Sequence, residues 1–323
     1  MADEESRDGV RLTNLDQPLF DGARATKRDL VDYLDAMSGV LLPHLRDRPL
    51  SVIRALRGQR PFMQKNLPRY APESVPRVTM FAESAGHDVV YALCNDRPTL
   101  LWFANQRAVE YHVTLLRAPD WPHPTHLVLD LDPPGNGGFQ AAVGAARLVR
   151  EVLAEVGMAA AVKTSGAKGV HVFAPVTGAD VEEVAAATRA VAARAERLDP
   201  ALATTAFIRE DRGGKVFLDA TRSGGATVVS VYSPRLRPGT TVSFPVAWDD
   251  LDGIAPADFT MRTVPDLLGG TDRWAETMPG PQPLDAGLIA EGRDIPIARV
   301  AAMHEGKRRA RARRAEAGDD ARA

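Results

Sequence analysis

The clearest pattern of apolar and polar positions begins at residue 126, where short apolar runs alternate with longer helical segments. Residues 139–157 carry apolar side chains at helical spacing, and Gly157 is a typical residue just beyond a helix C-terminus. Short apolar runs predict strands at 127–132, 160–164 and 170–176, and the small residues 165–169 predict a loop. This order is typical of a mixed α/β domain.

The pattern continues toward the C-terminus. Residues 180–198 are rich in alanine and predict a helix, because Asp180 and Glu183 have the spacing of a capping box. Two later runs, 215–221 and 226–233, predict further strands.

The N-terminal part contains one helical segment and one strand. Residues 26–45 place Leu30, Tyr33, Leu34 and Met37 at helical spacing, and Thr26 is a candidate N-cap. Residues 50–56 predict a strand that enters a loop with glycine and proline. Residues 1–11 predict a disordered N-terminus and residues 301–323 a charged tail, which leaves one domain over residues 12–300.

Composition narrows the class of protein. The chain has 323 residues, of which 45% are apolar and 25% charged, and its net charge of -2 gives no global signal for nucleic acid. Its one cysteine excludes an internal disulfide and a zinc site built on several thiolates. The acidic N-terminus is unlike a signal peptide, and no stretch approaches the roughly 18 apolar residues of a membrane helix. We therefore expect a cytoplasmic protein that has no membrane partner.

The strand at 127–132 ends on two acids, Asp130 and Asp132, just before Pro133 and Pro134. Strand side chains alternate between faces, so both carboxylates project to the same side and repel each other. A divalent cation removes that repulsion, and carboxylate oxygens are the ligands that magnesium and manganese prefer. The alternative interpretation is that the two acids cap a turn.

A third acid, Asp219, also ends an apolar run. Three carboxylates from two strands can hold two metal ions, which suits the transfer of a phosphoryl group. The loop 165–169 adds small residues, a hydroxyl and Lys168, a combination that suits phosphate oxygens. A simple turn with a solvated lysine is the alternative interpretation of that loop.

Basic residues are concentrated in three places. Residues 46–70 carry many basic side chains with interleaved aromatics, Arg235 and Arg237 follow the last predicted strand, and residues 307–314 form a basic run in the tail. Arginine binds phosphate bidentately, although solvated surface charges are an equally simple explanation. The tail run could contact a DNA backbone or only keep the chain soluble.

Nine motifs in one order resemble the polymerase domain of bacterial end-joining ligase D, a member of the archaeo-eukaryotic primase superfamily. They extend from about residue 12 to about residue 270 and read TNLD, LLPHLRDRPL, QKNLP, LLWFANQRAVEYH, DLDPP, KTSGAKGVHVFAPV, VFLDA, YSPRLRPG and FPVAWDDL. The resemblance implies an α/β fold of the α+β kind, with two β-sheets flanked by helices around a central active-site cleft.

The resemblance also implies the roles of particular residues. Asp130, Asp132 and Asp219 would be the catalytic acids that hold two divalent ions, Mn²⁺ or Mg²⁺. The nucleotide would be bound by Ser165, Gly166, Lys168, Gly169, His112 and Arg235. Template, DNA ends and a recessed 5′-phosphate would be contacted by Asn14, Gln17, Lys27, Arg54, Phe62 and Lys65.

From this resemblance we expect a DNA-dependent nucleotidyltransferase, a DNA polymerase that adds nucleotides to DNA 3′ ends in non-homologous end joining or gap-filling repair. It would prefer ribonucleotides and manganese, bind NTP or dNTP, associate with the nucleoid, and act as a stand-alone member with a Ku-like protein and a DNA ligase as partners.

The chain departs from the family pattern in three places. Gln17 replaces a lysine, Phe62 stands alone where many members have two aromatics, and the segment DATRSG follows the third acid in place of an aromatic-x-Gln-Asn sequence.

Two other function classes remain open. A haloacid-dehalogenase phosphatase also has a strand that ends in D-x-D, but Pro134 occupies its usual Thr/Val position. A DNA-end-binding module that has lost catalysis is the other, and the presence of all three acids argues against it.

Overall fold

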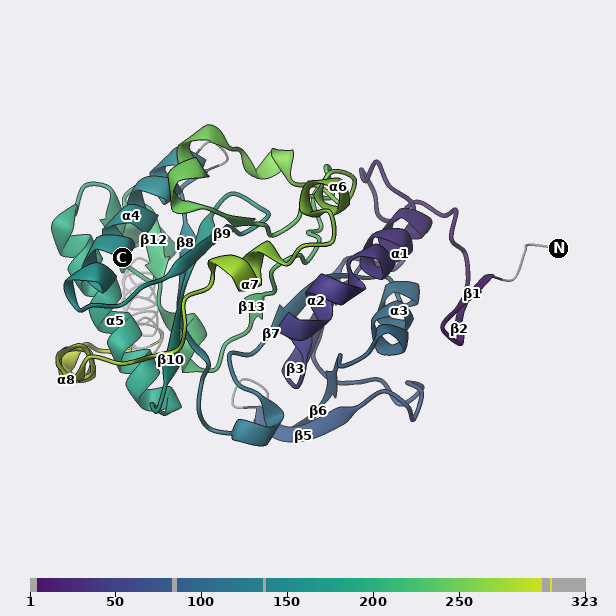
Figure 1. Ribbon diagram of the computed structural model, residues 1–323, viewed down its shortest axis with the longest axis horizontal. Coiled ribbons are helices and arrows are strands. Elements are labelled where there is room, and N and C mark those ends of the chain that lie inside the picture. Colours follow the sequence, from purple (N-terminus) through teal and green to yellow (C-terminus); the bar gives the residue numbers. More distant parts are fainter. Residues whose placement is uncertain (1–4, 83–85, 136–137, 298–302, 304–323) are drawn as a thin grey trace, which may run out of the picture.

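A computed structural model of the chain describes residues 5–82, 86–135, 138–297 and 303. Two β-sheets with helices around them form its two halves, as the resemblance implied (Figure 1). Among the described residues, no helix combines the length and apolar character needed to cross a bilayer.

The larger sheet has seven strands and contains the acid pair. Its order is β11 (Ala203–Thr204), β12 (Val216–Asp219), β8 (His126–Asp132), β10 (Val170–Thr177), β9 (Ala161–Thr164) and β14 (Pro245–Val246), with β15 (Gln282–Pro283) beside β10. Helices α4 (Phe139–Glu155) and α5 (Val181–Leu198) pack on each other and on this sheet, and α8 (Ala286–Asp294) packs on α5. The central strands are buried, so their residues read as nearly continuous apolar runs.

Local signals set the ends of these helices. Asp180 and Glu183 form the predicted capping box at the start of α5. Gly157 follows α4 with a φ of 74°, a left-handed conformation that glycine adopts without a steric penalty. The predicted strands at 127–132, 160–164, 170–176 and 215–221 correspond to β8, β9, β10 and β12.

The smaller sheet has six strands and forms the other half. Its order is β13 (Val228–Val229), β7 (Ala108–Val113), β3 (Pro49–Arg54), β6 (His87–Leu93) and β5 (Arg77–Ala82), with β4 (Phe62–Gln64) beside β3. Helices α1 (Lys27–Ala36), α2 (Ser38–Leu45) and α3 (Arg97–Asn105) pack beside it on the right of Figure 1. The predicted strand 50–56 corresponds to β3.

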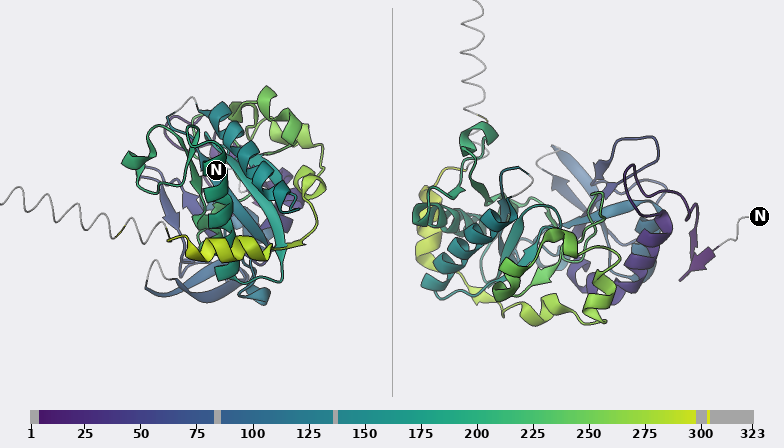
Figure 2. Two further views of the ribbon diagram at one scale, coloured as in Figure 1. Left: turned by 90° about the vertical axis from the view of Figure 1, so that its left-hand side faces the viewer. Right: turned by 90° about the horizontal axis from the view of Figure 1, so that it is seen from above.

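Short helices and 3₁₀ turns connect the remaining elements. Helices α6 (Val264–Leu268) and α7 (Arg273–Thr277) lie near the centre of Figure 1. The short 3₁₀ turns are η1 (Ala118–Asp120), η2 (Arg209–Arg212), η3 (Thr221–Gly224), η4 (Trp248–Gly253) and η5 (Pro256–Asp258). One continuous cluster of buried apolar side chains runs through both halves, which lie side by side when viewed from above (Figure 2). The boundary predicted at residue 300 lies outside the described residues.

Three expectations about local structure need correction. The single helix expected at 26–45 is two helices, α1 and α2, that meet at Met37. Ser38 and Gly39 follow Met37 and are weak helix formers, and Pro43 lacks the N–H that a continuous helix would use. Thr26 does cap α1, through the backbone N–H of Asp29.

The strand expected at 226–233 contains only the two residues of β13. Tyr232 leaves the extended conformation with a φ of 61°. Its hydroxyl contacts Asp272 Oδ1 and Trp274 N, and its carbonyl accepts a hydrogen bond from Tyr33 Oη. These buried contacts turn the chain away from the sheet.

Disorder was expected over residues 1–11, but β1 (Glu5–Arg7) and β2 (Val10–Leu12) form an antiparallel hairpin. The Arg7 guanidinium lies within salt-bridge distance of Glu5, Asp32 and Asp35, which anchors the hairpin to α1. Residues 1–4 lie outside the described residues.

Candidate active site

The acids of the larger sheet meet because β8 and β12 are antiparallel neighbours. Asp219 on β12 lies directly opposite Asp130 on β8, and Phe217 lies opposite Asp132. Directly opposed residues in an antiparallel pair present their side chains to the same face. The structure therefore brings together two acids that are 89 positions apart in the chain, and we call Asp130, Asp132 and Asp219 the acid end of the site.

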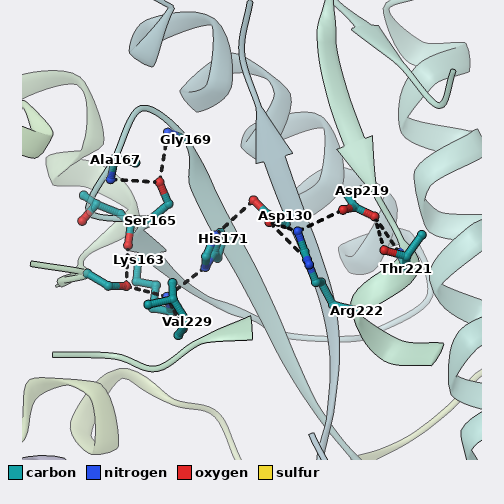
Figure 3. A network of polar contacts seen from close by, with 12 residues as sticks. Asp130, Lys163, Ser165, Ala167, Gly169, His171, Asp219, Thr221, Arg222 and Val229 are labelled. Carbon is teal, nitrogen blue, oxygen red and sulfur yellow. Dashed lines mark hydrogen bonds and ion pairs between the residues drawn. The ribbon is translucent and has the colours of Figure 1, made fainter. Parts of the chain in front are cut away.

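Arg222 lies between two of these carboxylates (Figure 3). Its Nη2 is 2.9 Å from Asp130 Oδ2 and 3.2 Å from Asp219 Oδ2. Arg222 is on the η3 turn, three residues after Asp219, and the N–H and hydroxyl of Thr221 donate to Asp219 Oδ1. Burial of Arg222 lowers the pKa of its guanidinium, but the charges of Asp130 and Asp219 outweigh burial and raise it.

The other oxygen of Asp130 is bound from within the sheet. His171 Nε2 lies 3.1 Å from Asp130 Oδ1, and His171 Nδ1 lies 2.9 Å from the Nζ of Lys163. Lys163 is fully buried and also donates to Ser243 Oγ and the carbonyl of Val229. Because Lys163 donates to Nδ1, the proton of His171 belongs on Nε2, where it is donated to Asp130.

Burial and neighbouring charges together set the pKa values of this network. Burial and the charge of Lys163 lower the pKa of His171 to about 4, against the opposite effect of Asp130. Burial alone would raise the pKa of Asp130, but His171 and Arg222 together hold that carboxyl below its ordinary value. The carboxylate of Asp130 is therefore ionised and held by two donors.

Asp132 differs from its two partners. It is half-buried, and within the described parts of the chain no hydrogen bond or ion pair holds its carboxylate. Burial and the charge of Asp130 raise its pKa. In the same described residues, no three His, Cys, Asp or Glu side chains lie close enough to form a ready-made metal cage.

The loop 165–169 packs closely against the end of β8. Ser165 Oγ accepts hydrogen bonds from the backbone N–H groups of Ala167 and Gly169, and Lys168 Nζ donates to the carbonyl of Pro133. A Cβ atom on Gly169 would lie 2.3 Å from the carbonyl oxygen of Leu131, so only glycine fits there. Figure 3 shows this loop beside the acid network.

A second cluster, from the smaller sheet, reaches the same loop. Arg235 donates to the carbonyl of Ser165 through Nη1, and its Nε lies 3.1 Å from Glu110 Oε2. His112 Nε2 lies 2.9 Å from the same carboxylate, and the N–H of Leu236 donates to Glu110 Oε1. We call Ser165, Lys168, His112 and Arg235 the phosphate end of the site.

Glu110 is a buried anion between two residues predicted to bind phosphate. Burial alone would raise the pKa of its carboxyl, but His112 and Arg235 lower it to about 2. Burial lowers the pKa of His112, against the opposite effect of Glu110. Gly166, with a φ of 69°, lies where a Cβ would approach the side chain of Arg235 to 2.7 Å. Arg235 and Arg237 follow the strand predicted at 226–233, but residues 235–240 form a turn, and of these two arginines only Arg237 is exposed.

The residues predicted to contact DNA belong to the N-terminal half. Arg54 is buried, donates to Gln64 Oε1 and Tyr70 Oη, and lies against the ring of exposed Phe62. Lys65 follows β4 and is half-buried. These three residues share one region around β3 and β4.

The residues predicted to bind a 5′-phosphate form another group. Asn14 is exposed and accepts from Gln17 Nε2. Lys27 is only 3% exposed and donates to Asn105 Oδ1 and the carbonyl of Thr13. Burial and the charge of Arg107 lower the pKa of Lys27 to about 8. Lys27 is the first residue of α1, which lies in the other half of the molecule from β8 (Figure 1).

Sequence reasoning missed Lys163, Glu110 and Arg222 as parts of the site. Arg222 and Glu110 are ion-pair partners of predicted residues on other elements, and Lys163 bonds to His171, which in turn binds Asp130. Only Glu110 left a signal, because it lies two positions before His112 on one strand and therefore shares its face. Two surface pockets, of about 560 and 390 Å³, are lined by none of the predicted site residues.

The chain is similar to known proteins in both sequence and structure. Residues 26–274 match the family model of the LigD primase-polymerase domain. The chain is 34% identical over 265 residues to the bifunctional non-homologous end joining protein LigD of Bacillus subtilis, covering 80% of this chain and 42% of that protein. It is 35% identical over 265 residues to the multifunctional non-homologous end joining DNA repair protein LigD of Mycobacterium tuberculosis, covering 76% of this chain and 34% of that protein. The chain thus spans less than half the length of these relatives.

A solved structure is also similar. The polymerase domain of Mycobacterium tuberculosis ligase D, in complex with DNA, superposes with a TM-score of 0.74 at 32% sequence identity. The match covers 90% of this chain and all of that domain. The comparisons give no support to a phosphatase or to a binding module without catalysis.

Proposed function

The chain belongs to the LigD primase-polymerase family, whose members are nucleotidyltransferases, and we propose that it extends DNA 3′ ends at breaks and gaps. The observation that carries this proposal is the opposition of Asp130 and Asp219 on neighbouring strands. The loop 165–169, which follows β9, lies beside these acids and supplies Lys168 and Ser165.

The acid end fits divalent cations by its donor chemistry. Three carboxylates are hard oxygen donors of the kind that Mg²⁺ and Mn²⁺ take. A cationic group, Arg222, already lies between Asp130 and Asp219, so the site favours positive charge. When bound, two such ions would lower the pKa of the attacking hydroxyl and neutralise charge on the reacting phosphate. Asp130, Asp132 and Asp219 would hold them.

The protein's own residues would bind and orient the substrates. The 3′ oxygen of the primer forms a bond to the α-phosphorus of the nucleotide, and the bond between that phosphorus and the bridging oxygen breaks, so pyrophosphate leaves. Lys168 and Arg235 would neutralise the triphosphate, and His112 would do so in its protonated form, while Ser165 donates its hydroxyl. His171 and Lys163 keep the carboxylate of Asp130 oriented.

Preference for ribonucleotides is part of the proposal. A protein distinguishes ribose by a hydrogen bond to the 2′-hydroxyl. Ser165 and His112 are the candidates, because both carry a hydrogen-bonding group within the phosphate end. An NTP and dNTP comparison in primer extension tests this assignment.

The N-terminal half would hold the DNA. Exposed Phe62 would offer its ring to the template, with the buried guanidinium of Arg54 against that ring and Lys65 beside them. Asn14, Gln17 and Lys27 would receive a recessed 5′-phosphate, with Gln17 contributing no charge. In this role the protein would associate with the nucleoid and work with a Ku-like protein and a DNA ligase.

One experiment tests the proposal as a whole. Purified protein is given gapped, recessed and blunt DNA with Mn²⁺ or Mg²⁺ and with NTP or dNTP. We expect incorporation by the wild type and a loss of about 10³-fold or more in Asp130→Asn, because the substitution removes a charge that stabilises the transition state. Asp252→Asn, which alters an exposed ion pair with Arg147, is the control. Undiminished incorporation by Asp130→Asn contradicts the proposal.

A further inference from the structure

We propose that Arg222 is an internal cation that occupies the acid end and competes with divalent metal for Asp130 and Asp219. The proposal rests on the function proposed above. It adds a residue that controls how readily the acids accept a metal.

Arg222 takes the oxygens that a shared metal would need. Nη2 and Nε both lie near Asp130 Oδ2, at 2.9 and 3.2 Å, and Nη2 also lies 3.2 Å from Asp219 Oδ2. The remaining oxygens, Asp130 Oδ1 and Asp219 Oδ1, accept from His171 and Thr221. All four oxygens of the two acids therefore have donors, and the guanidinium is the only one of these donors that carries a full positive charge at neutral pH (Figure 3).

Electrostatics explains why a cation is present there. Asp130 and Asp219 are only 9% and 7% exposed, and Asp132 adds a third acidic group. Two neighbouring buried carboxylates without a counter-charge would repel each other and lose most of their solvation. Arg222 supplies that counter-charge in the protein alone, where a metal supplies it in the loaded site.

Arg222 is better placed to leave than the other donors. Its side chain is 28% exposed, whereas that of His171 is 3% exposed. It extends from the short η3 turn, and its other contact is a 3.3 Å hydrogen bond from Nη1 to the carbonyl of Thr227. Rotation of this long side chain toward solvent would free Asp130 Oδ2 and Asp219 Oδ2 together, while His171 keeps Asp130 oriented.

The absence of a ready-made metal cage among the described residues agrees with this arrangement. A divalent ion must replace the guanidinium before it can bridge these two acids. Metal affinity is thereby reduced by the free energy of the Arg222 contacts, and the acid end takes up metal only when the ion concentration is high enough to displace them.

The test measures Mn²⁺ binding without nucleotide or DNA, from the electron paramagnetic resonance signal of free Mn²⁺. The variants are Arg222→Gln, which removes the competing cation, and Lys168→Gln as a matched control. Lys168 also carries a charge that acts on Asp132, but within the described residues its Nζ donates to the carbonyl of Pro133 and to no carboxylate. Circular dichroism checks that each variant is folded.

We expect Arg222→Gln to bind Mn²⁺ about tenfold more tightly than the wild type, and Lys168→Gln no more than about threefold more tightly. In EDTA, Arg222→Gln should melt at a lower temperature than the wild type, because its acids lack a counter-charge, and Mn²⁺ should raise its melting temperature more. Arg222→Lys keeps the positive charge but lacks the planar guanidinium, so its Mn²⁺ affinity should lie between those of the wild type and Arg222→Gln. If Arg222→Gln does not fold, the Mn²⁺ affinity of Arg222→Lys is compared with that of the wild type in its place.

Equal or weaker Mn²⁺ binding by Arg222→Gln overturns the role of Arg222. So does an equal gain in both glutamine variants, because that gain would reflect charge at a distance rather than competition for oxygens. Mn²⁺ binding that Asp130→Asn abolishes but Arg222→Gln leaves unchanged refutes only this inference. No Mn²⁺ binding by any variant refutes the proposed metal site as well.

Discussion

The two ends of the candidate site neutralise their charges in opposite ways. At the acid end, clustered carboxylates are held by a cation, Arg222. At the phosphate end, His112 and Arg235 are held by an anion, Glu110. Each end thus contains an internal counter-ion, and its charge has the same sign as the charge of the ligand that we expect that end to bind.

The two partners differ in how firmly they are held. Arg222 comes from a 3₁₀ turn and its side chain is 28% exposed, whereas Glu110 lies within β7 and its side chain is 6% exposed. Glu110 also accepts from the backbone N–H of Leu236, so both of its oxygens are used. The comparison indicates that Arg222 can be exchanged for a ligand, while Glu110 stays and orients the groups that face the triphosphate.

Removal of the buried lysine behind the acid end should have the largest effect on stability. Lys163→Met leaves His171 Nδ1, Ser243 Oγ and the carbonyl of Val229 without their donor. We expect a loss of about 3 kcal/mol in the free energy of unfolding, measured in urea, because three buried polar groups lose a partner. Nucleotide incorporation should fall as well, since His171 can then move its proton away from Asp130.

Lys168→Met is the matched control for this prediction. Lys168 is half-buried and donates to a single carbonyl, that of Pro133. The Lys168→Met variant should lose less than about 1 kcal/mol in the free energy of unfolding. An equal loss of unfolding free energy in Lys163→Met and Lys168→Met would show that the hydrogen bonds of Lys163 contribute no more to stability than the single bond of Lys168.

Glu110→Gln tests whether the phosphate end depends on a fixed anion. We expect a loss of about 2 kcal/mol in the free energy of unfolding, because the substitution breaks a buried ion pair with Arg235. KM for the nucleotide should rise more than kcat falls, since His112 and Arg235 lose their orientation. Asp252→Asn, in an exposed pair with Arg147, should change stability by less than about 0.5 kcal/mol. An unchanged KM would show that Glu110 does not orient these groups.

The stabilising effect of Glu110 should depend on pH. Its pKa is lowered from 4.5 in the unfolded chain to about 2 in the folded protein, so the folded state favours the ionised form. The contribution is fully present above about pH 4.5 and is lost as the pH falls toward 2. The difference in unfolding free energy between wild type and Glu110→Gln should therefore be smaller at pH 3 than at pH 6. A constant difference over that range would contradict the assignment.

Lys27 gives the smallest expected effect, at a distance from both ends. Burial lowers its pKa to about 8, so above that pH the amine of the free protein loses its charge. If Lys27 receives a 5′-phosphate, the affinity gained from that phosphate should fall about threefold between pH 7 and pH 9, measured by fluorescence anisotropy on gapped DNA. Lys27→Gln should show no such dependence on pH, and an equal dependence in this variant would exclude Lys27 as the cause.

Local structure in the C-terminal half followed from the sequence alone. Alternating and helical spacings predicted β8, β10, α4 and α5, because these patterns depend only on neighbouring residues. The capping box of Asp180 and the left-handed Gly157 followed from the same local chemistry. The loop 165–169 and Arg235 were candidates for phosphate binding from their residue types alone, whereas the resemblance supplied His112 and the DNA residues, and all of these assignments stay predictions.

The composition of the site was decided by tertiary structure. Asp219 faces Asp130 only because β12 pairs with β8 in one register, and Lys163 meets Ser243 across 80 positions. Packing between distant segments sets such registers, and one strand's alternation holds no information about its neighbour. For the same reason, the sequence alone could place Asp130 and Asp132 on one face of a strand. Only the fold could place Arg222 between Asp130 and Asp219.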